Sequence, residues 1–204
     1  MEQSFTFNYD WNVAFMQQAQ LMSTRSKDPS TKVGCIIVSP DRFVLSEGYN
    51  GFPRGVADTP ERLNDRAQKY PRVVHAEANA IINAGRNGAK IDNGILFVTQ
   101  PPCPNCAKMI AQAGIREVFY IDVDKSKKGI PGWRDELNIS FDIFDEVGIK
   151  YKSIPKKYLF TKSQLASLRT KQLSAFAKAN ADKPKHIDAA IKAIEVAKSM
   201  DLQM

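Results

Sequence analysis

Two short runs of the sequence contain residue types that can bind a metal ion and move protons. The first run contains His75 and Glu77, and the second, Pro-Cys-Pro-Asn-Cys, contains Cys103 and Cys106. The histidine and the two cysteines supply three nitrogen and sulfur ligands, which leaves the fourth tetrahedral position of a zinc ion free for a water molecule. Glu77 can then carry protons for that water without binding the metal. These residue types are together suited to hydrolysis.

A C-x-x-C pair taken alone has other interpretations: a structural zinc site, a redox pair, or two cysteines without a shared role. A redox pair is disfavoured because Pro-Pro precedes the cysteines, and a structural zinc normally takes a fourth protein ligand. The remaining candidates are distant, since His186 lies near the C-terminus and Cys35 in an apolar run. We interpret His186 as a surface residue and Cys35 as a small core hydrophobe. A catalytic zinc site is therefore favoured.

The composition bounds the class of protein. The chain has 204 residues, of which 43% are hydrophobic and 25% charged, which predicts one well-buried soluble domain with an appendage. No apolar run approaches the roughly 20 residues of a membrane helix, and the first residues lack a signal-peptide pattern. We expect a cytoplasmic protein. The net charge of +7 is compatible with nucleic acid and equally with anionic small molecules such as nucleotides.

The first third of the chain predicts a helix, a hairpin and a loop. Residues 10–26 have apolar positions at helical spacing with Asp10 as the N-cap. Residues 33–48 read as two strands joined at Pro40. The loop 48–58 is rich in Gly, Pro and Asn, which favours close approach to a ligand and a plain surface loop about equally.

The candidate metal ligands should lie at two helix ends. Successive helical residues rotate by about 100°, so His75 and Glu77 can converge only in a first turn. We predict that one helix begins close to His75 and that a second begins at the cysteines, with Pro104 in its first position. The positive ends of both helix dipoles would then face the metal site, and Glu77 could also serve simply as an acid that complements the dipole.

The remaining elements complete an α/β domain. We expect strands at 95–100 and 116–123, a loop at 124–138, a helix through Val147 and a short last strand. This order predicts a three-layer α/β/α fold with a central mixed sheet of about five strands and helices on both faces. Trp133, in the loop, is assigned to packing rather than to covering a substrate. We place the catalytic domain at 1–158 and a helical C-terminal extension, with two amphipathic helices, at 159–204.

With these elements in view, residues 10–155 resemble the deoxycytidylate (dCMP) deaminases of the cytidine deaminase superfamily. The resemblance is carried by the zinc motif and by the runs HAEANAI, SKDPSTKVG and GYNGFPRG, while KKGIPGWRDEL is similar to a segment of bacteriophage members. It implies a cytidine deaminase-like fold and zinc-dependent hydrolytic deamination of dCMP to dUMP and ammonia, which supplies thymidylate synthesis. The cytoplasm would be that of the host if the chain is viral.

The resemblance also implies roles for individual residues. One Zn²⁺ per subunit would be bound by His75, Cys103 and Cys106, and Glu77 would act first as base and then as acid. The implied substrate contacts are Ser26 and Lys27 with the 5′-phosphate, Asn50 with the deoxyribose and the Ala76 backbone with the base.

Regulation and assembly are a further implication. Family members are typically hexamers, activated by dCTP with Mg²⁺ and inhibited by dTTP. The implied effector residues are Gly48, Tyr49, Asn50, Gly51 and Arg54.

Three rival functions remain open at this point. The substrate could be dCTP, which shares the ring and sugar of dCMP. A deaminase acting on tRNA adenosine or another nucleobase would use the same metal site, although the GYNG loop disfavours it and we expect no nucleic-acid partner. A non-catalytic nucleotide sensor is disfavoured because Glu77 and the three ligands are all present.

Overall fold

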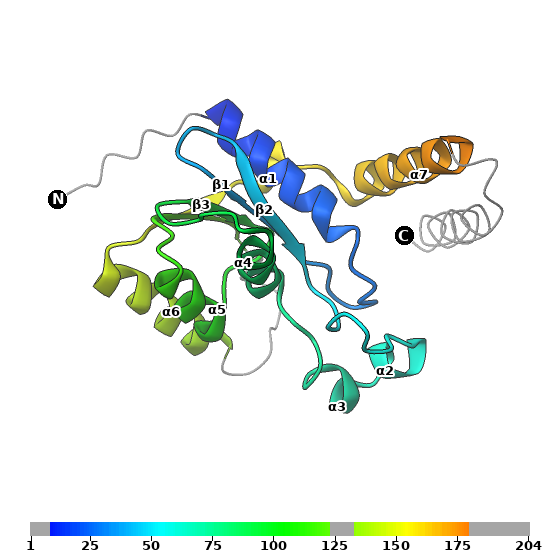
Figure 1. Ribbon diagram of the computed structural model, residues 1–204, viewed down its shortest axis with the longest axis horizontal. Helices are drawn as coiled ribbons and strands as arrows, with labels where there is room; N and C mark the ends of the chain where they lie inside the picture. The colour runs from blue at the N-terminus through cyan, green and yellow to red at the C-terminus, as the bar shows by residue number, and fades with distance from the viewer. Residues whose placement is uncertain (1–8, 123–132, 180–204) are drawn as a thin grey trace. The chain divides into compact units, whose positions relative to one another are not determined.

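The computed structural model describes residues 9–122 and 133–179. The chain divides into two compact units, residues 1–159 and 160–204. The described part of the first unit is built on a five-stranded sheet with the strand order β2-β1-β3-β4-β5 (Figure 1).

The sheet is mixed, as the order of elements predicts. The interior strand β1 pairs in antiparallel fashion with β2 on one side and with β3 on the other, whereas β3, β4 and β5 run parallel to one another. The strand bounds are Gly34–Val38 for β1, Val44–Tyr49 for β2, Ile95–Val98 for β3, Glu117–Ile121 for β4 and Lys150–Ile154 for β5. All residues of β1 are buried because helices cover both faces of the sheet.

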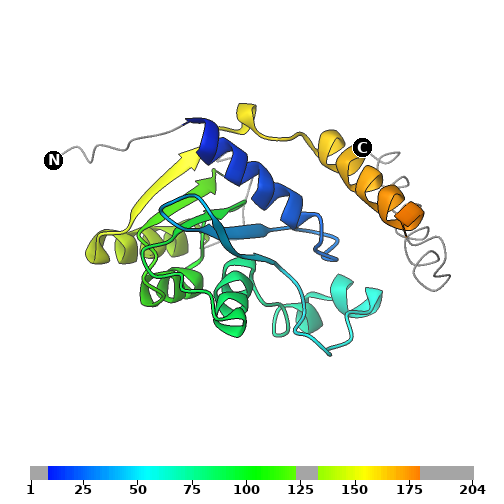
Figure 2. The same cartoon turned by 45° about the horizontal axis from the view of Figure 1, so that its top comes forward.

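Alternate residues of the strands pack into two apolar clusters, one on each face. On one face Ile36 and Phe97 contact α1 (Tyr9–Ser23) through Phe15. On the other face the sheet packs against α4 (Ala76–Asn87), α5 (Pro104–Gln112) and α6 (Trp133–Val147). Figure 2 shows α1 on one side of the sheet and these three helices on the other. The predicted three-layer α/β/α arrangement is therefore confirmed.

Several element boundaries differ from those predicted. The helix α1 begins at Tyr9, so Asp10 lies within its first turn and is not the N-cap. The helix α6 begins at Trp133, so residues 133–138 are helical although the sequence suggested a loop there. The other part of that predicted loop, and the side chain of Trp133, lie outside what the structure describes. Gly129, Pro131 and Gly132 are the signals that favour a loop before Trp133, but such signals do not show where a helix starts.

Two short helices occupy a polar stretch for which no element was predicted. These are α2 (Pro60–Asn64) and α3 (Arg66–Lys69). Each has a side-chain cap, since Thr59 accepts a hydrogen bond from the Arg62 amide and Asp65 accepts one from the Ala67 amide. The caps explain the helix starts in a segment without apolar periodicity.

Beyond β5, a short 3₁₀ helix spans Lys156–Tyr158, and α7 spans Lys162–Ala179 in the second unit. The start of α7 is set by a reciprocal pair: the Gln164 amide donates to Thr161 Oγ1, and the Thr161 amide donates to Gln164 Oε1 at 2.8 Å. The predicted second helix of the extension falls on residues 187–197, outside the described part of the chain. Among the described residues, no helix combines the length and the apolar character needed to cross a membrane.

Candidate active site

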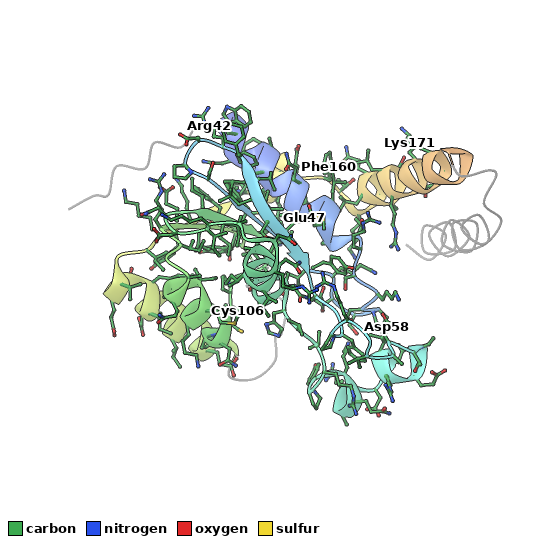
Figure 3. The ribbon with its side chains drawn as sticks, in the orientation of Figure 1. Arg42, Glu47, Asp58, Cys106, Phe160 and Lys171 are labelled. Atoms are coloured by element: carbon green, nitrogen blue, oxygen red, sulfur yellow. The ribbon has the colours of Figure 1, made fainter. Side chains whose placement is uncertain are left out.

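The structure brings His75, Cys103 and Cys106 together at one point. His75 Nδ1 lies 3.5 Å from the Sγ atom of Cys103 and 3.5 Å from that of Cys106, and the three ligand atoms lie within 4.8 Å of one another. A tetrahedral zinc ion with ordinary bond lengths would separate a nitrogen from a sulfur ligand by roughly 3.6 Å. The donor types and their spacing therefore fit zinc. Figure 3 marks Cys106 in α5.

Two helix N-termini position these side chains. The sequence predicts both, one close to His75 and one at the cysteines. His75 is the N-cap of α4, with φ −71° and ψ 157°, and Cys103 is the N-cap of α5, with φ −76° and ψ 167°. Pro104 follows in the first helical position, and Cys106 lies in the first turn. Neither N-cap side chain makes a capping hydrogen bond. Both side chains are therefore available to bind a metal ion at the positive ends of two helix dipoles.

Glu77 lies in the first turn of α4 and is only 4% exposed. Burial disfavours its charged form and raises the pKa of this carboxyl to about 7, against the opposing effects of backbone hydrogen bonding and of nearby His75. A carboxyl with a pKa close to neutral can both accept and donate a proton at physiological pH. This property suits the acid and base roles expected for Glu77.

The pKa values of the two site cysteines shift in opposite directions, and the hydrogen bond to Cys103 raises the pKa of the Cys106 thiol. Hydrogen bonds from Cys106 and from His75 hold the pKa of the Cys103 thiol below its usual value. The thiolate is the form of cysteine that binds metal ions. Cys35 lies in β1 and is fully buried, and burial raises the pKa of its thiol. Its position agrees with a packing role.

Three of the four predicted substrate contacts lie close together. Ser26 and Lys27 belong to the loop after α1, and Asn50 forms hydrogen bonds with that loop. Ser26 is buried, its Oγ accepts the Asp28 amide, and its carbonyl accepts Lys32 Nζ. Lys27 is exposed and forms an ion pair with Asp58 at 2.8 Å (Asp58 is labelled in Figure 3).

Asn50 follows the end of β2 and holds this loop. Its Oδ1 accepts the Val33 amide at 2.8 Å, and its Nδ2 donates to the Thr31 carbonyl at 2.9 Å. The fourth predicted contact, Ala76, is buried beside His75 as the first residue of α4.

The predicted effector run contacts the segment that carries His75. Gly48 lies in β2 directly against α4, and Tyr49 ends that strand. Gly51 forms a two-way backbone bridge with Val74, the residue before His75. Arg54 Nη2 donates to Asn83 Oδ1 of α4 at 3.1 Å.

A buried ion pair near these residues has no counterpart in the sequence interpretation. Lys69 Nζ lies 3.1 Å from Asp28 Oδ1, and their side chains are 6% and 8% exposed. The same oxygen accepts the backbone amides of Ser30 and Thr31. This pair joins α3 to the loop that contains Ser26 and Lys27. Charge alone does not reveal it, because charged side chains in a polar run are usually exposed.

Comparison with known proteins agrees with this geometry. The model of the cytidine and deoxycytidylate deaminase zinc-binding region matches residues 9–122. A deaminase of Aliivibrio fischeri is 38% identical over 145 residues, which cover 71% of this chain and 94% of that protein. The deoxycytidylate deaminase of Homo sapiens is 39% identical over 153 residues, covering 72% of this chain and 82% of that protein.

The fold has a counterpart among solved structures. The crystal structure of the dCMP deaminase from cyanophage S-TIM5, in complex with dCMP and dUMP, matches with a TM-score of 0.58 and 29% sequence identity, covering 72% of this chain and 98% of that one. The predicted cytidine deaminase-like fold is thereby confirmed. On the strength of the matched zinc-binding region and these relatives, the chain belongs to the cytidine and deoxycytidylate deaminase family.

Proposed function

We propose that this protein catalyses the zinc-dependent hydrolytic deamination of dCMP to dUMP and ammonia, and so supplies dUMP for thymidylate synthesis. The observation that carries the chemistry is the convergence of His75, Cys103 and Cys106 beside the buried Glu77. The choice of dCMP is supported by the likeness to the cyanophage enzyme that was crystallised with dCMP and dUMP.

Glu77 carries the protons of this reaction. Zinc bound by His75, Cys103 and Cys106 would act as a Lewis acid that activates a water molecule for attack at C4 of the cytosine ring. Glu77 accepts a proton from the water as the C–O bond forms and delivers it to N3. It then takes the second proton from the new C4 hydroxyl and delivers it to the amino group, which leaves as ammonia when the C–N bond breaks. Its raised pKa, about 7, suits this exchange of roles.

The substrate contacts in this proposal follow the described hydrogen bonds. The Ala76 backbone, beside His75, would contact the base, and Asn50 would bind the deoxyribose through the second N–H of its amide, since the first is bonded to Thr31. Ser26 and Lys27 would bind the 5′-phosphate. Because Lys27 is paired with Asp58 at the surface, a phosphate would have to compete with that carboxylate.

Ammonia release tests the proposed reaction. Cytidine, dCMP and dCTP are each supplied to the purified protein under the same conditions, and ammonia is measured over time. We expect turnover of dCMP, and the rate with dCTP decides whether the triphosphate is also a substrate. Activity with cytidine and none with dCMP would refute the proposal.

We further propose that dCTP with Mg²⁺ activates the enzyme, that dTTP inhibits it and that the subunits form a hexamer. The contacts of the run 48–54 with Val74 and α4 support an effector site at Gly48, Tyr49, Asn50, Gly51 and Arg54, since a ligand bound there would touch the segment that carries His75. A dCMP rate that stays flat on addition of dCTP and Mg²⁺ would contradict the activation, and sedimentation would test the hexamer.

A further inference from the structure

The catalytic helix α4 is attached to the edge strand β2 by two asparagine side chains. Asn79 Nδ2 donates to the Tyr49 carbonyl at 2.8 Å, and one turn later Asn83 Nδ2 donates to the Glu47 carbonyl at 2.9 Å (Glu47 is labelled in Figure 3). These carbonyls belong to the edge of the sheet, where β2 has no further strand beside it in the described part of the chain. The asparagine amides thus bond strand carbonyls that would otherwise face solvent.

The helix also approaches the strand very closely between these two bonds. A Cβ atom placed on Gly48 would lie 2.4 Å from the Ala76 carbonyl oxygen and 2.5 Å from the Ala80 amide nitrogen. On the buried side, Ser46 Oγ donates to the Ala80 carbonyl at 2.7 Å. These contacts leave little freedom for α4 to slide or rotate on β2, because they involve backbone atoms of the helix, which cannot move without moving the helix itself.

Asn79 differs from Asn83 in its position along the helix. The backbone N–H of Asn79 donates to the backbone carbonyl of His75, with an N–O distance of 3.0 Å, and this bond closes the first turn of α4. That turn contains both His75 and Glu77. Asn79 therefore joins the turn that carries a candidate metal ligand and the candidate proton carrier to the sheet, whereas Asn83 lies one turn farther along and bonds Arg54 as well.

We propose that Asn79 is a positioning residue for the deamination, whose side-chain bond to the Tyr49 carbonyl holds the first turn of α4 so that His75 and Glu77 keep their places relative to Cys103 and Cys106. Only the expected effect on kcat rests on the proposed function; the expected effect on zinc binding does not. Residues that orient metal ligands from outside the coordination sphere typically contribute about 10- to 100-fold to metal affinity or activity. Asn79 acts in this way through the backbone of its own helix.

The test compares Asn79→Ala with Asn83→Ala in the full-length zinc-loaded protein. Both substitutions remove one amide bond to β2 and place the best helix-forming residue in the same helix, so both variants should fold. We expect Asn79→Ala to lower kcat for dCMP and to speed the transfer of zinc to a chromogenic chelator, each by about 10- to 100-fold. Asn83→Ala should change both quantities by less than about 3-fold. Its Tm should fall at least as much as that of Asn79→Ala, because it deletes the exposed bond from Arg54 as well as the bond to Glu47.

Equal effects of the two substitutions on kcat and on zinc transfer would overturn the proposal, and so would unchanged zinc transfer in Asn79→Ala. If Asn79→Ala does not fold, Asn79→Asp, which keeps the size and removes the donor, replaces it in the same comparison. Zinc transfer does not depend on turnover. A protein that releases no ammonia from dCMP would therefore refute the proposed function and leave the role of Asn79 to be decided by the chelator.

Discussion

Glu77 combines deep burial with a pKa close to neutral, and its replacement tests the proton-transfer role directly. In Glu77→Gln the amide keeps the size of the side chain but cannot accept a proton. We expect kcat for dCMP to fall by about 10²- to 10⁴-fold, while metal analysis still finds one zinc per chain. Glu61→Gln, at an exposed position of α2, is the control and should leave both quantities unchanged. Loss of zinc in Glu77→Gln would instead indicate that the carboxylate helps to hold the metal.

The buried pair of Asp28 and Lys69 makes a second prediction for single side chains. Lys69→Met leaves the Asp28 carboxylate buried without its cation, which should cost about 3–5 kcal/mol in the free energy of unfolding. Lys27→Met removes the surface pair with Asp58, whose lysine side chain is 68% exposed, and should cost at most about 1 kcal/mol. Urea unfolding of the two variants measures the difference. If the two variants lose equal free energies of unfolding, the buried pair contributes no more to stability than the surface pair.

The two pairs illustrate what the sequence can and cannot reveal about single residues. His75, Glu77, Cys103 and Cys106 can be proposed as a site from residue type and local spacing, because each pair of neighbours lies within a few positions along the chain. Lys69 and Asp28 are 41 positions apart, and each stands in a polar run that gives no sign of burial. Their contact depends on how α3 meets the loop after α1, which no local pattern encodes.

At the scale of elements, the close contact of α4 with β2 predicts a sharp difference between two glycines. Gly48→Ala would place a Cβ atom 2.4 Å from the Ala76 carbonyl oxygen, so α4 must shift away from the strand. Such overpacking typically costs about 1–3 kcal/mol. Because α4 carries His75 and Glu77, kcat should fall as well. Thermal unfolding and ammonia release measure the two effects.

Gly85→Ala in the same helix is the matched control. A Cβ atom at Gly85 would meet nothing within 4 Å, and alanine is favoured over glycine inside a helix by roughly 0.5–1 kcal/mol. We therefore expect this variant to unfold at a higher temperature and to keep its kcat. If Gly48→Ala were as stable and as active as Gly85→Ala, the tight packing of α4 on β2 would not matter for the site.

Elements with strong local signals were predictable, and those without them were not. The starts of α4 and α5 follow from the need for His75 and Glu77 to converge and from Pro104. The short helices α2 and α3 lack an apolar face that periodicity could reveal, so only their caps at Thr59 and Asp65 mark them. The close approach at Gly48 was also not predictable, because a glycine in a strand looks the same whether a helix or solvent lies above it.

For the whole molecule, the order of strands and helices was enough to predict a mixed sheet covered on both faces. The two apolar clusters on these faces are made of described residues that all lie between Val13 and Leu159. The core of the catalytic fold is therefore complete, among the described residues, before α7 begins. This supports our proposal of a catalytic domain followed by a C-terminal extension, although Leu159, the first residue of the proposed extension 159–204, packs against the core of the domain proposed at 1–158.

Removal of residues 160–204 tests that proposal. We expect the shortened chain to unfold in urea in one cooperative transition, with a free energy of unfolding close to that of the full chain, because both apolar clusters are retained. Its kcat for dCMP should stay within about 3-fold, a change of less than about 1 kcal/mol in the activation free energy. Sedimentation of both chains then asks whether the extension contributes to subunit contacts. A shortened chain that has lost zinc and cooperative unfolding would show that the extension belongs to the catalytic fold.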